Sequence, residues 1–328
     1  MPWKLRPGWR ASIEEGHLVV SSDVRSLRVA RCAGLGSDLA FELSSEIGLS
    51  RYSLETLRLL EQLETRGLVT NTDPTSTARE EQTRLDAYFS HIGMDSIACR
   101  NAIESAVVTI IGVGGTGAII LQHLVGAGVR SFILADQDAV ERTNLERQFI
   151  FGPEMIGWPK TKAAAAYIQS RCPDANIQTR DGSIASRADV QSLCVDVSRS
   201  STCIVCIDRP FEVAVRILPQ ALWDIGVSSL QGGVMIRSGF YGPVFDPQRS
   251  PSTPEMLWGD VKNTEAALPV GVCFSPNNTI IASLMASQVL HHLIGAQDLV
   301  EYKNRTFVDL FRRQFSRLNE LGTYDTTR

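Results

Sequence analysis

The segment Ala106-Val-Val-Thr-Ile-Ile-Gly112-Val-Gly114-Gly-Thr-Gly117 joins an apolar, mostly β-branched run to a cluster of glycines. Such a run is typical of a strand buried on both faces of a parallel sheet. The glycines match Gly-x-Gly-x-x-Gly, a tight turn that brings the backbone and a helix N-terminus close to a phosphate. Asp136 follows about 20 residues later, where a carboxylate accepts ribose hydroxyls in nucleotide-binding folds. The segment predicts a nucleotide site that is compatible with NAD and with ATP.

The chain around this segment alternates between expected strands and helices. Strands are expected at 106–111, 130–136, 176–180 and 202–208, and helices at 116–128, 160–171, 211–223 and 279–294. Repeated strand–helix–strand units predict the α/β class, with a doubly wound, Rossmann-like, mostly parallel sheet. The Pro- and Ser-rich stretch 239–269 predicts a long loop that covers the site.

Residues 1–75 predict a separate α+β module of winged-helix-like character. Short strands are expected at 17–20 and 27–31, followed by a helix that begins after Ser53 and a strand after Gly67. The segment 71–77 lacks large apolar residues and is typical of a linker. We therefore expect a module at 1–75, a linker with helices at 76–105, and a nucleotide-binding domain at 106–328.

The charge of the chain argues against nucleic acid as its partner. The net charge is −4, and residues 1–75 carry nine Lys/Arg against ten Asp/Glu. Proteins that bind DNA usually carry a basic surplus, because neutralising phosphates drives their affinity. Peptide docking is therefore the preferred interpretation of the module, with plain structural packing as the alternative.

The cysteines and the apolar segments predict a cytoplasmic protein that does not bind a membrane. Seven cysteines, an odd number, do not suggest a disulfide framework. The N-terminus lacks the apolar core of a signal peptide, and no apolar stretch approaches the ~20 residues that a membrane span needs. Cys203 and Cys206 lie in an apolar strand and are expected to be core residues.

Three further motifs resemble the ThiF/MoeB and ubiquitin-activating superfamily of adenylating enzymes. Asp136-Gln-Asp138 is followed by Asn144-Leu-Glu-Arg147-Gln148, which resembles the superfamily's D-x-D and N-L-x-R-Q elements. The other two motifs are Gly157-Trp-Pro-Lys160-Thr-Lys162 and Ile204-Val-Cys-Ile-Asp208. The resemblance covers about residues 84–295 and favours ATP over NAD.

The resemblance implies a role for each matching residue. Arg147 and Lys160 would contact the phosphates, Asn144 would assist, Asp208 would hold Mg²⁺, and Gln148 would order its loop. Lys162 is the alternative to Lys160. The nucleotide itself would be bound by Gly112, Gly114, Gly115, Gly117, Asp136 and Asp138.

The chain also departs from the superfamily pattern. Ala87 stands where relatives place an arginine that reaches into the partner's site of a homodimer, so Arg84 or Arg100 is expected to substitute. Paired CxxC motifs are missing from 246–254 and 271–276, so no zinc site is expected. No cysteine lies between Arg209 and Val272, which disfavours a thioester intermediate.

These departures resemble the peptide-modifying branch of the superfamily, whose members act in microcin C and pantocin A biosynthesis. The resemblance implies a homodimer that adenylates a carboxylate of a short, ribosomally made precursor peptide. A nucleophile of the same peptide would then attack and give a modified or cyclised product. The alternatives are adenylation of a ubiquitin-like sulfur carrier and, with less support, a nicotinamide-binding oxidoreductase with a winged domain.

Overall fold

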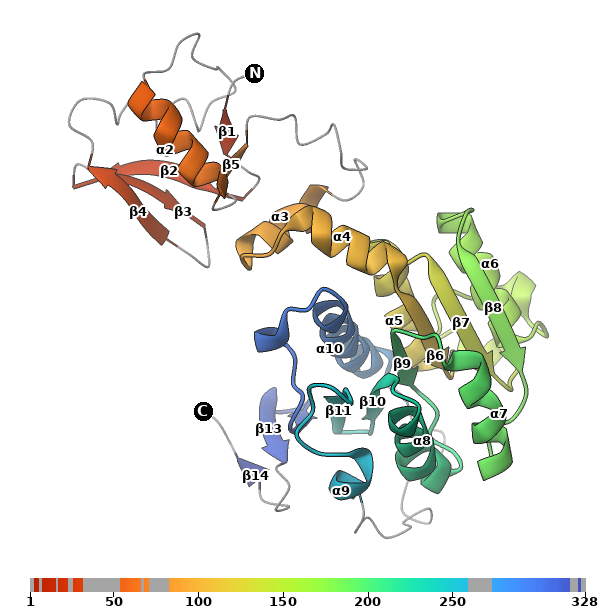
Figure 1. Cartoon of the computed structure of the whole chain (residues 1–328). Coiled ribbons are helices and arrows are strands. Elements are labelled where there is room, and N and C mark those ends of the chain that lie inside the picture. The colour runs from red at the N-terminus through yellow and green to blue at the C-terminus, as the bar shows by residue number, and fades with distance from the viewer. Residues whose placement is uncertain are drawn as a thin grey trace. The chain divides into compact units, whose positions relative to one another are not determined.

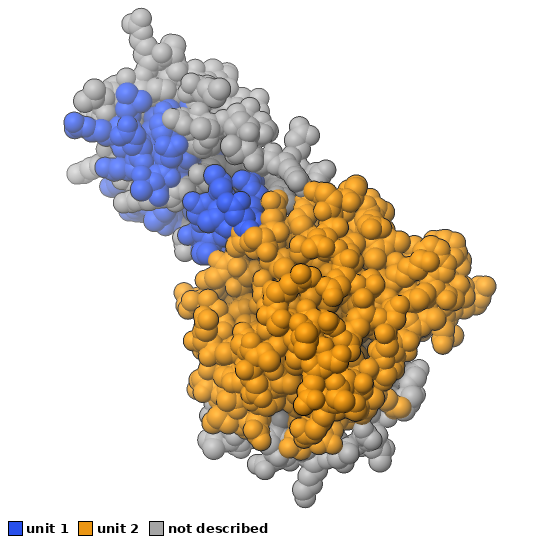
Figure 2. Space-filling view, turned by 45° about the vertical axis from the view of Figure 1, so that its right-hand side comes forward, with its two compact units in different colours: residues 1–101 blue, residues 102–328 orange. Residues whose placement is uncertain are grey.

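The structure is a computed structural model, and it divides into two compact units at 101/102 (Figure 2). The described residues are 3–5, 8–15, 17–22, 26–31, 54–65, 68–70, 83–258, 273–318 and 324–325. The predicted linker 71–77, together with Ser53 and Gly67, lies outside them. The predicted boundaries at 75 and 105 stay predictions.

The second unit is built on one nine-stranded sheet in the order β14-β13-β12-β11-β10-β9-β6-β7-β8 (Figure 1). Its parallel half comprises β6 (Val107–Ile111), β7 (Ser131–Asp136), β8 (Asn176–Asp181), β9 (Thr202–Val205) and β10 (Ser228–Val234). Its antiparallel half comprises β11 (Ser238–Phe245), β12 (Arg305–Asp309), β13 (Gln314–Leu318) and β14 (Tyr324–Asp325). The predicted α/β class with a mostly parallel central sheet is confirmed.

Helices cover both faces of this sheet. α5 (Gly115–Ala127) and α6 (Lys160–Arg171) connect β6, β7 and β8, whereas α7 (Arg187–Val197) and α8 (Leu218–Asp224) follow the reversal of strand order after β8. Because parallel crossovers are right-handed, this reversal places α7 and α8 on the opposite face from α5 and α6. α10 (Ser275–Leu293) packs against α5, β10 and β11.

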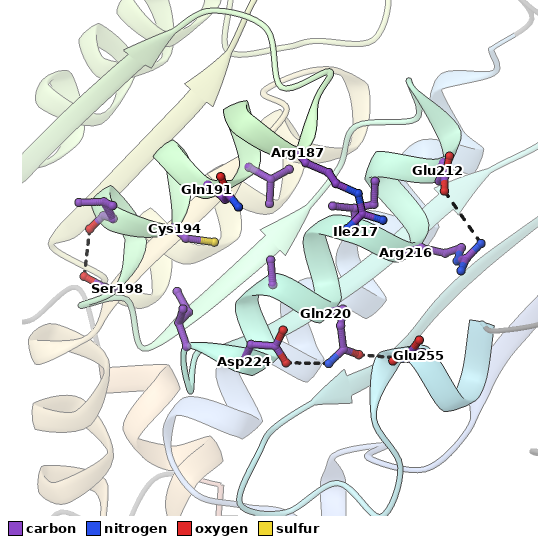
Figure 3. A pocket seen from close by; sticks show the side chains of 14 residues that line it. Arg187, Gln191, Cys194, Ser198, Glu212, Arg216, Ile217, Gln220, Asp224 and Glu255 are labelled. Atoms are coloured by element: carbon purple, nitrogen blue, oxygen red, sulfur yellow. Dashed lines mark hydrogen bonds and ion pairs between the residues drawn. The ribbon is translucent and has the colours of Figure 1, made fainter.

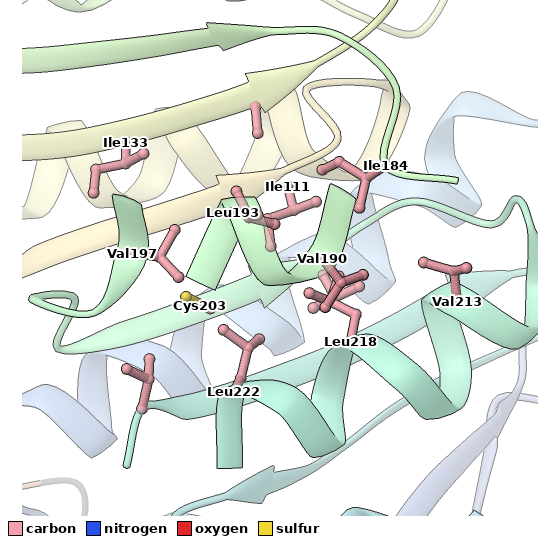
Figure 4. Packing of buried hydrophobic residues seen from close by; sticks show 13 residues of the cluster. Ile111, Ile133, Ile184, Val190, Leu193, Val197, Cys203, Val213, Leu218 and Leu222 are labelled. Carbon is pink, nitrogen blue, oxygen red and sulfur yellow. The ribbon is translucent and has the colours of Figure 1, made fainter. Parts of the chain in front are cut away.

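The face under α7 and α8 forms a continuous apolar core (Figure 4). The side chains of Leu193 and Leu222, from the two helices, are fully buried against Ile111 and Cys203 from the strands. Only one side of α7 takes part in this packing, because Val190, Leu193 and Val197 are buried whereas Val195 on the same helix is 75% exposed.

Three elements differ from the expectation. β9 ends at Val205, so Asp208 lies in the following loop rather than at the end of a strand. The helix expected at 211–223 contains a π-helical segment, Val213–Ile217, before α8. α10 begins at Ser275, four residues earlier than expected.

The loop expected at 239–269 is wrong for its first residues, which form β11 and pair with β10 and β12. The strand was missed because glycine and proline, which this segment contains, are uncommon inside strands. Pro243 lies beyond Tyr241, the last residue that pairs with β12, so its missing N–H breaks no bond of that ladder. After β11 comes a short helix, α9 (Pro254–Trp258), and 259–272 lie outside the described residues.

The first unit contains a small antiparallel sheet of β2 (Arg10–Glu14), β3 (His17–Ser21) and β4 (Ser26–Arg31). β1 (Lys4–Leu5) pairs with β5 (Val69–Thr70), and α2 (Leu54–Thr65) supplies the helix. Its own core joins sheet and helix, with these residues buried: Trp3, Trp9, Leu18, Val20, Leu60, Leu63, Leu68 and Val69. The predicted α+β character is confirmed. α3 (Thr83–His91) and α4 (Ser96–Ser105) follow.

Among the described residues, no helix combines the length and the apolar character that crossing a bilayer requires.

Replacing Leu193 by Ala tests the core under α7. The fully buried side chain leaves a cavity, so we expect the free energy of unfolding to fall by about 2–5 kcal/mol in urea denaturation followed by circular dichroism. Val195→Ala on the exposed side of the same helix is the control, and its effect should stay within about 0.5 kcal/mol. Equal losses for the two variants would contradict this packing.

Candidate active site

The glycine loop at the carboxyl end of β6 is shaped by very close backbone contacts. Gly112 has φ +92°, in the left-handed region, and its N–H donates to the Ala135 carbonyl at 2.7 Å. A Cβ at Gly117 would lie 2.0 Å from the Gly112 carbonyl oxygen. Gly114 precedes α5, and no side chain in the described structure caps this helix end. The loop therefore offers an uncapped helix N-terminus to an anion.

Asp136, at the end of β7, fastens the glycine loop to the neighbouring strand. Its Oδ2 accepts a hydrogen bond from the Val113 N–H at 2.7 Å, and its Oδ1 accepts one from the Asp138 N–H at 2.8 Å. Burial raises the pKa of Asp136, against the opposing effects of these N–H groups and Lys160. The position agrees with the end-of-strand carboxylate expected for ribose binding, and that role stays a prediction.

Lys160 begins α6 and directs its charge at Asp138. Its Nζ lies 2.7 Å from Asp138 Oδ2, and its backbone N–H donates to the Asp138 carbonyl at 2.9 Å. The Lys160 side chain is 8% exposed, whereas that of Asp138 is 54% exposed. Lys162 instead lies over the Trp158 ring, with Nζ 4.8 Å from its centroid. The structure thus brings Lys160 to the site and leaves Lys162 on the surface.

Asn144 is buried and shapes the turn that carries Arg147 and Gln148. Its Oδ1 accepts from the Glu141 N–H at 3.0 Å, and its carbonyl accepts from the Gln148 N–H at 2.9 Å. The Asn144 side chain is thus hydrogen-bonded to the backbone of its own turn, and in the structure it stabilises that turn.

Gln148 and Arg147 both lie against the glycine loop. Gln148 is 2% exposed, its Nε2 lies 3.9 Å from where a Cβ of Gly114 would stand, and its Oε1 has no hydrogen-bond partner among the described residues. Arg147 Cδ lies 3.6 Å from the corresponding position at Gly115, and its Nη1 donates to the Thr143 carbonyl at 2.8 Å and to Glu146 at 3.0 Å. A buried acceptor without a donor is costly, which fits a ligand donor at this place.

Asn278 is a residue of this site that the sequence analysis missed. It is buried near the start of α10, and its Nδ2 lies 2.3 Å from where a Cβ of Gly115 would stand. The same Nδ2 donates to Cys273 Sγ at 3.2 Å. Pro276 at the beginning of the helix was the signal that could have revealed this helix start.

Asp208 reaches the same edge of the sheet through the loop after β9. Its neighbour Ile207 lies 3.0 Å from where a Cβ of Gly112 would stand, and Asp208 itself is exposed. No cluster of three or more His, Cys, Asp or Glu side chains occurs in the described ranges. One exposed carboxylate without a partner among the described residues fits Mg²⁺, which keeps several waters and binds substrate phosphates.

The proposed trans-acting arginines belong to the first unit. Arg84 on α3 is exposed, and Arg100 is buried with Nη1 2.5 Å from Asp86 Oδ2. Arg100 is therefore committed to a local ion pair, and the role of Arg84 stays a prediction.

Cys203 is buried, as expected, and Cys206 is partly buried. Burial raises the pKa of both thiols to about 12, so neither forms a reactive thiolate near neutral pH.

A groove of about 870 Å³ lies between α7 and α8, with Glu255 of α9 at its rim (Figure 3). Gln220 ties the rim together, because its Nε2 donates to Asp224 at 2.8 Å and its Oε1 accepts from the Glu255 N–H at 3.0 Å. None of the predicted site residues lines it, so the polar contacts at the glycine loop define the candidate active site instead.

Gly117→Ala tests the glycine loop. The added methyl group would collide with the Gly112 carbonyl, so we expect nucleotide binding, measured by isothermal titration calorimetry, to be lost. Gly126→Ala on the same helix is the matched control, because its Cβ would meet nothing within 4 Å. That variant should bind normally and gain about 0.5–1 kcal/mol of stability. Normal binding by Gly117→Ala would contradict the site.

Curated relatives match only part of the chain. The SAMP-activating enzyme E1 of Haloferax volcanii is 36% identical over 100 residues, which are 30% of this chain and 37% of the relative. Ubiquitin-like modifier-activating enzyme 5 of Bombyx mori is 32% identical over 38% of this chain and 35% of its own length. The sulfur carrier protein ThiS adenylyltransferase of Escherichia coli is 32% identical over 37% and 48%. The chain thus spans between about a third and a half of these relatives.

Solved structures match almost the whole chain. E. coli MccB with ATP superposes with a TM-score of 0.76 at 17% identity, over 98% of this chain and 97% of that one. PaaA gives a TM-score of 0.73 at 18% identity, over 97% and 99%. At these identities the likeness establishes the fold alone. The ThiF family profile matches residues 84–326, which include the glycine loop, Lys160 and Asp208, and the chain therefore belongs to the ThiF family.

Proposed function

We propose that the protein uses ATP to adenylate a carboxylate of a short, ribosomally made precursor peptide. The observation that carries the proposal is the set of groups around the glycine loop: the uncapped end of α5, the Arg147 side chain, the buried Lys160 ammonium and the exposed Asp208 carboxylate. A nicotinamide site has no use for two cations and an exposed carboxylate next to its glycine loop. This favours transfer at a triphosphate over hydride transfer.

The chemistry follows from those groups. An oxygen of the substrate carboxylate attacks the α-phosphorus of ATP, the bond to the β-phosphate bridging oxygen breaks, and pyrophosphate leaves. Negative charge grows on the phosphates, and Arg147, Lys160 and the α5 N–H groups would stabilise it from fixed positions. Mg²⁺, held by Asp208, would neutralise phosphate charge when bound. A nucleophile of the peptide would then attack the carbonyl carbon and release AMP.

The peptide substrate is supported by the extent of the structural likeness. MccB has been solved in complex with N-formylated MccA, and its likeness to this chain extends over 98% of our sequence, including the N-terminal unit. We propose that the α+β module holds the precursor while the second unit performs the chemistry. A cytoplasmic homodimer with Arg84 acting on the partner's site completes the proposal.

A ubiquitin-like sulfur carrier is the second candidate substrate. The similarity to the ThiS adenylyltransferase of Escherichia coli favours it. The departures from the superfamily pattern, above all the missing cysteine between 209 and 272, weigh against it.

The decisive measurement is pyrophosphate release from ATP with Mg²⁺, with and without the short peptide encoded beside the gene. We expect release that depends on the peptide and stops on adding excess EDTA. Asp208→Ala should abolish release while leaving peptide affinity unchanged, and Asp224→Ala on α8 serves as the control.

Release that depends instead on a small Gly-Gly-ending carrier would select the second candidate. Tight NADH binding without any release would contradict both.

Lys160→Ala and Lys162→Ala separate a phosphate contact from a surface lysine. Lys160→Ala should slow pyrophosphate release by about 100-fold or more, because a buried cation is lost from the leaving-group site. Lys162→Ala should change the rate by less than about threefold, because its exposed contact with Trp158 is weak. Asp138 is half exposed and tolerates the loss of its partner, so both variants should fold. The reverse order of effects would show that Lys162 is the phosphate lysine.

A further inference from the structure

Two turns of the antiparallel half lie on the same edge of the sheet as the glycine loop. β10 runs parallel to β9 and β6, so it ends at that carboxyl edge, and β11 starts there after the turn 235–237. β12 is antiparallel to β11 and therefore also ends there, at Asp309, before the turn 310–313. Figure 1 shows β10 and β11 beside α10. Asp136 and Lys160 lie on the other side of the glycine loop, toward β7. The β10–β13 side is therefore left for the substrate that ATP would adenylate.

Hydrogen bonds connect the two turns to the active site. Asn277 Nδ2, beside Asn278 at the start of α10, donates to the Ile236 carbonyl at 3.1 Å. The Leu310 N–H donates to the Arg237 carbonyl at 2.9 Å, and Arg237 Nη2 lies 2.9 Å from Asp309 Oδ2. The turns are thus held in fixed positions relative to the helix end that packs on Gly115.

Exposed apolar and basic side chains lie along this edge. Phe274 is 63% exposed, Ile236 is 48% exposed and Phe311 is 68% exposed. Arg312 and Arg313 follow Phe311 and are also exposed. We call Ile236, Arg237, Phe274, Phe311, Arg312 and Arg313 the edge surface.

The positive charge of the edge surface is only partly balanced. Asp309 pairs with Arg237, but neither Arg312 nor Arg313 forms an ion pair with any residue in the described part of the chain. Arg313 has φ +58°, a backbone conformation that favours glycine or asparagine, so the turn itself gives no reason for an arginine. Two cations without an ion pair among the described residues thus stand here in a chain whose net charge is −4.

We propose that the edge surface binds the part of the substrate peptide next to the reacting carboxylate, and that this part combines acidic with apolar side chains. The inference rests on the proposed adenylation of a peptide and narrows its substrate class. Arg312 and Arg313 attract carboxylates, while Phe274, Ile236 and Phe311 supply apolar contact area. A peptide bound there would lie on the β10–β13 side of the glycine loop.

Fluorescence anisotropy with labelled peptides tests this inference on the full chain without ATP. The probes are peptides of about 12 residues that repeat Glu-Phe-Gly, Gln-Phe-Gly or Lys-Phe-Gly. We expect the Glu peptide to bind roughly tenfold more tightly than the Gln peptide at low salt, and the Lys peptide to bind least. The double variant Arg312→Gln/Arg313→Gly should lose this preference, with glycine suiting the positive φ. Arg187→Gln, an exposed arginine on α7, is the control and should keep it.

Four results would overturn the inference. The first is equal binding of the Glu and Gln peptides, and the second is an unchanged preference in the double variant. The third is an oligo-dT that binds the wild-type chain more tightly than the Glu peptide does, with this binding lost in the double variant. The fourth is a change in the oligomeric state of the double variant, measured by light scattering. If the double variant unfolds at a lower temperature, Phe311→Ser takes its place and should weaken all three peptides alike. Selective Glu-peptide binding without pyrophosphate release would refute only the proposed function, whereas release without selectivity would refute only this inference.

Discussion

The close approach of Gly112 and Gly117 is the contact on which the rest of the site depends. α5 can start directly at the end of β6 only because neither residue carries a Cβ, since one at Gly117 would stand 2.0 Å from the Gly112 carbonyl oxygen. The same loop receives the Asp136 carboxylate from β7 and Ile207 from the loop after β9. Two further segments of the chain thus contact this one backbone turn.

The polar groups around that turn are held in place by contacts within the protein. Lys160 is paired with Asp138, Asp136 with two backbone N–H groups, and Asn144 with Glu141. Fixed dipoles and charges need little reorganisation when negative charge develops, which is how enzymes gain most from electrostatics. Gln148 Oε1 is the exception, and leaving such a buried acceptor unpaired costs about 1–3 kcal/mol. The site has therefore kept one acceptor available for a ligand.

The parallel half of the fold was predictable because its signals are local. The apolar run before Gly112 and the Ala-rich stretch from Lys160 gave strand and helix bounds within a residue. β11 was missed because its glycines and Pro243 are atypical of a strand, and the packing of Asn278 on Gly115 was missed because the two residues are far apart in the sequence. Likewise, the residue types at Lys160 and Lys162 are identical, and only burial beside Asp138 distinguishes them.

The turn after β11 shows how polar side chains stabilise the antiparallel half. Asp246 organises this turn by accepting from the Gln248 N–H at 2.8 Å and pairing with Arg249. Ser250 accepts from the Asp246 N–H and donates to the Val244 carbonyl, each at 2.8 Å. Buried charge of this kind is stabilising only when every partner is present. This turn fixes the end of β11 at the edge of the sheet opposite the glycine loop, and the Asn277 side chain fixes the turn before the start of β11.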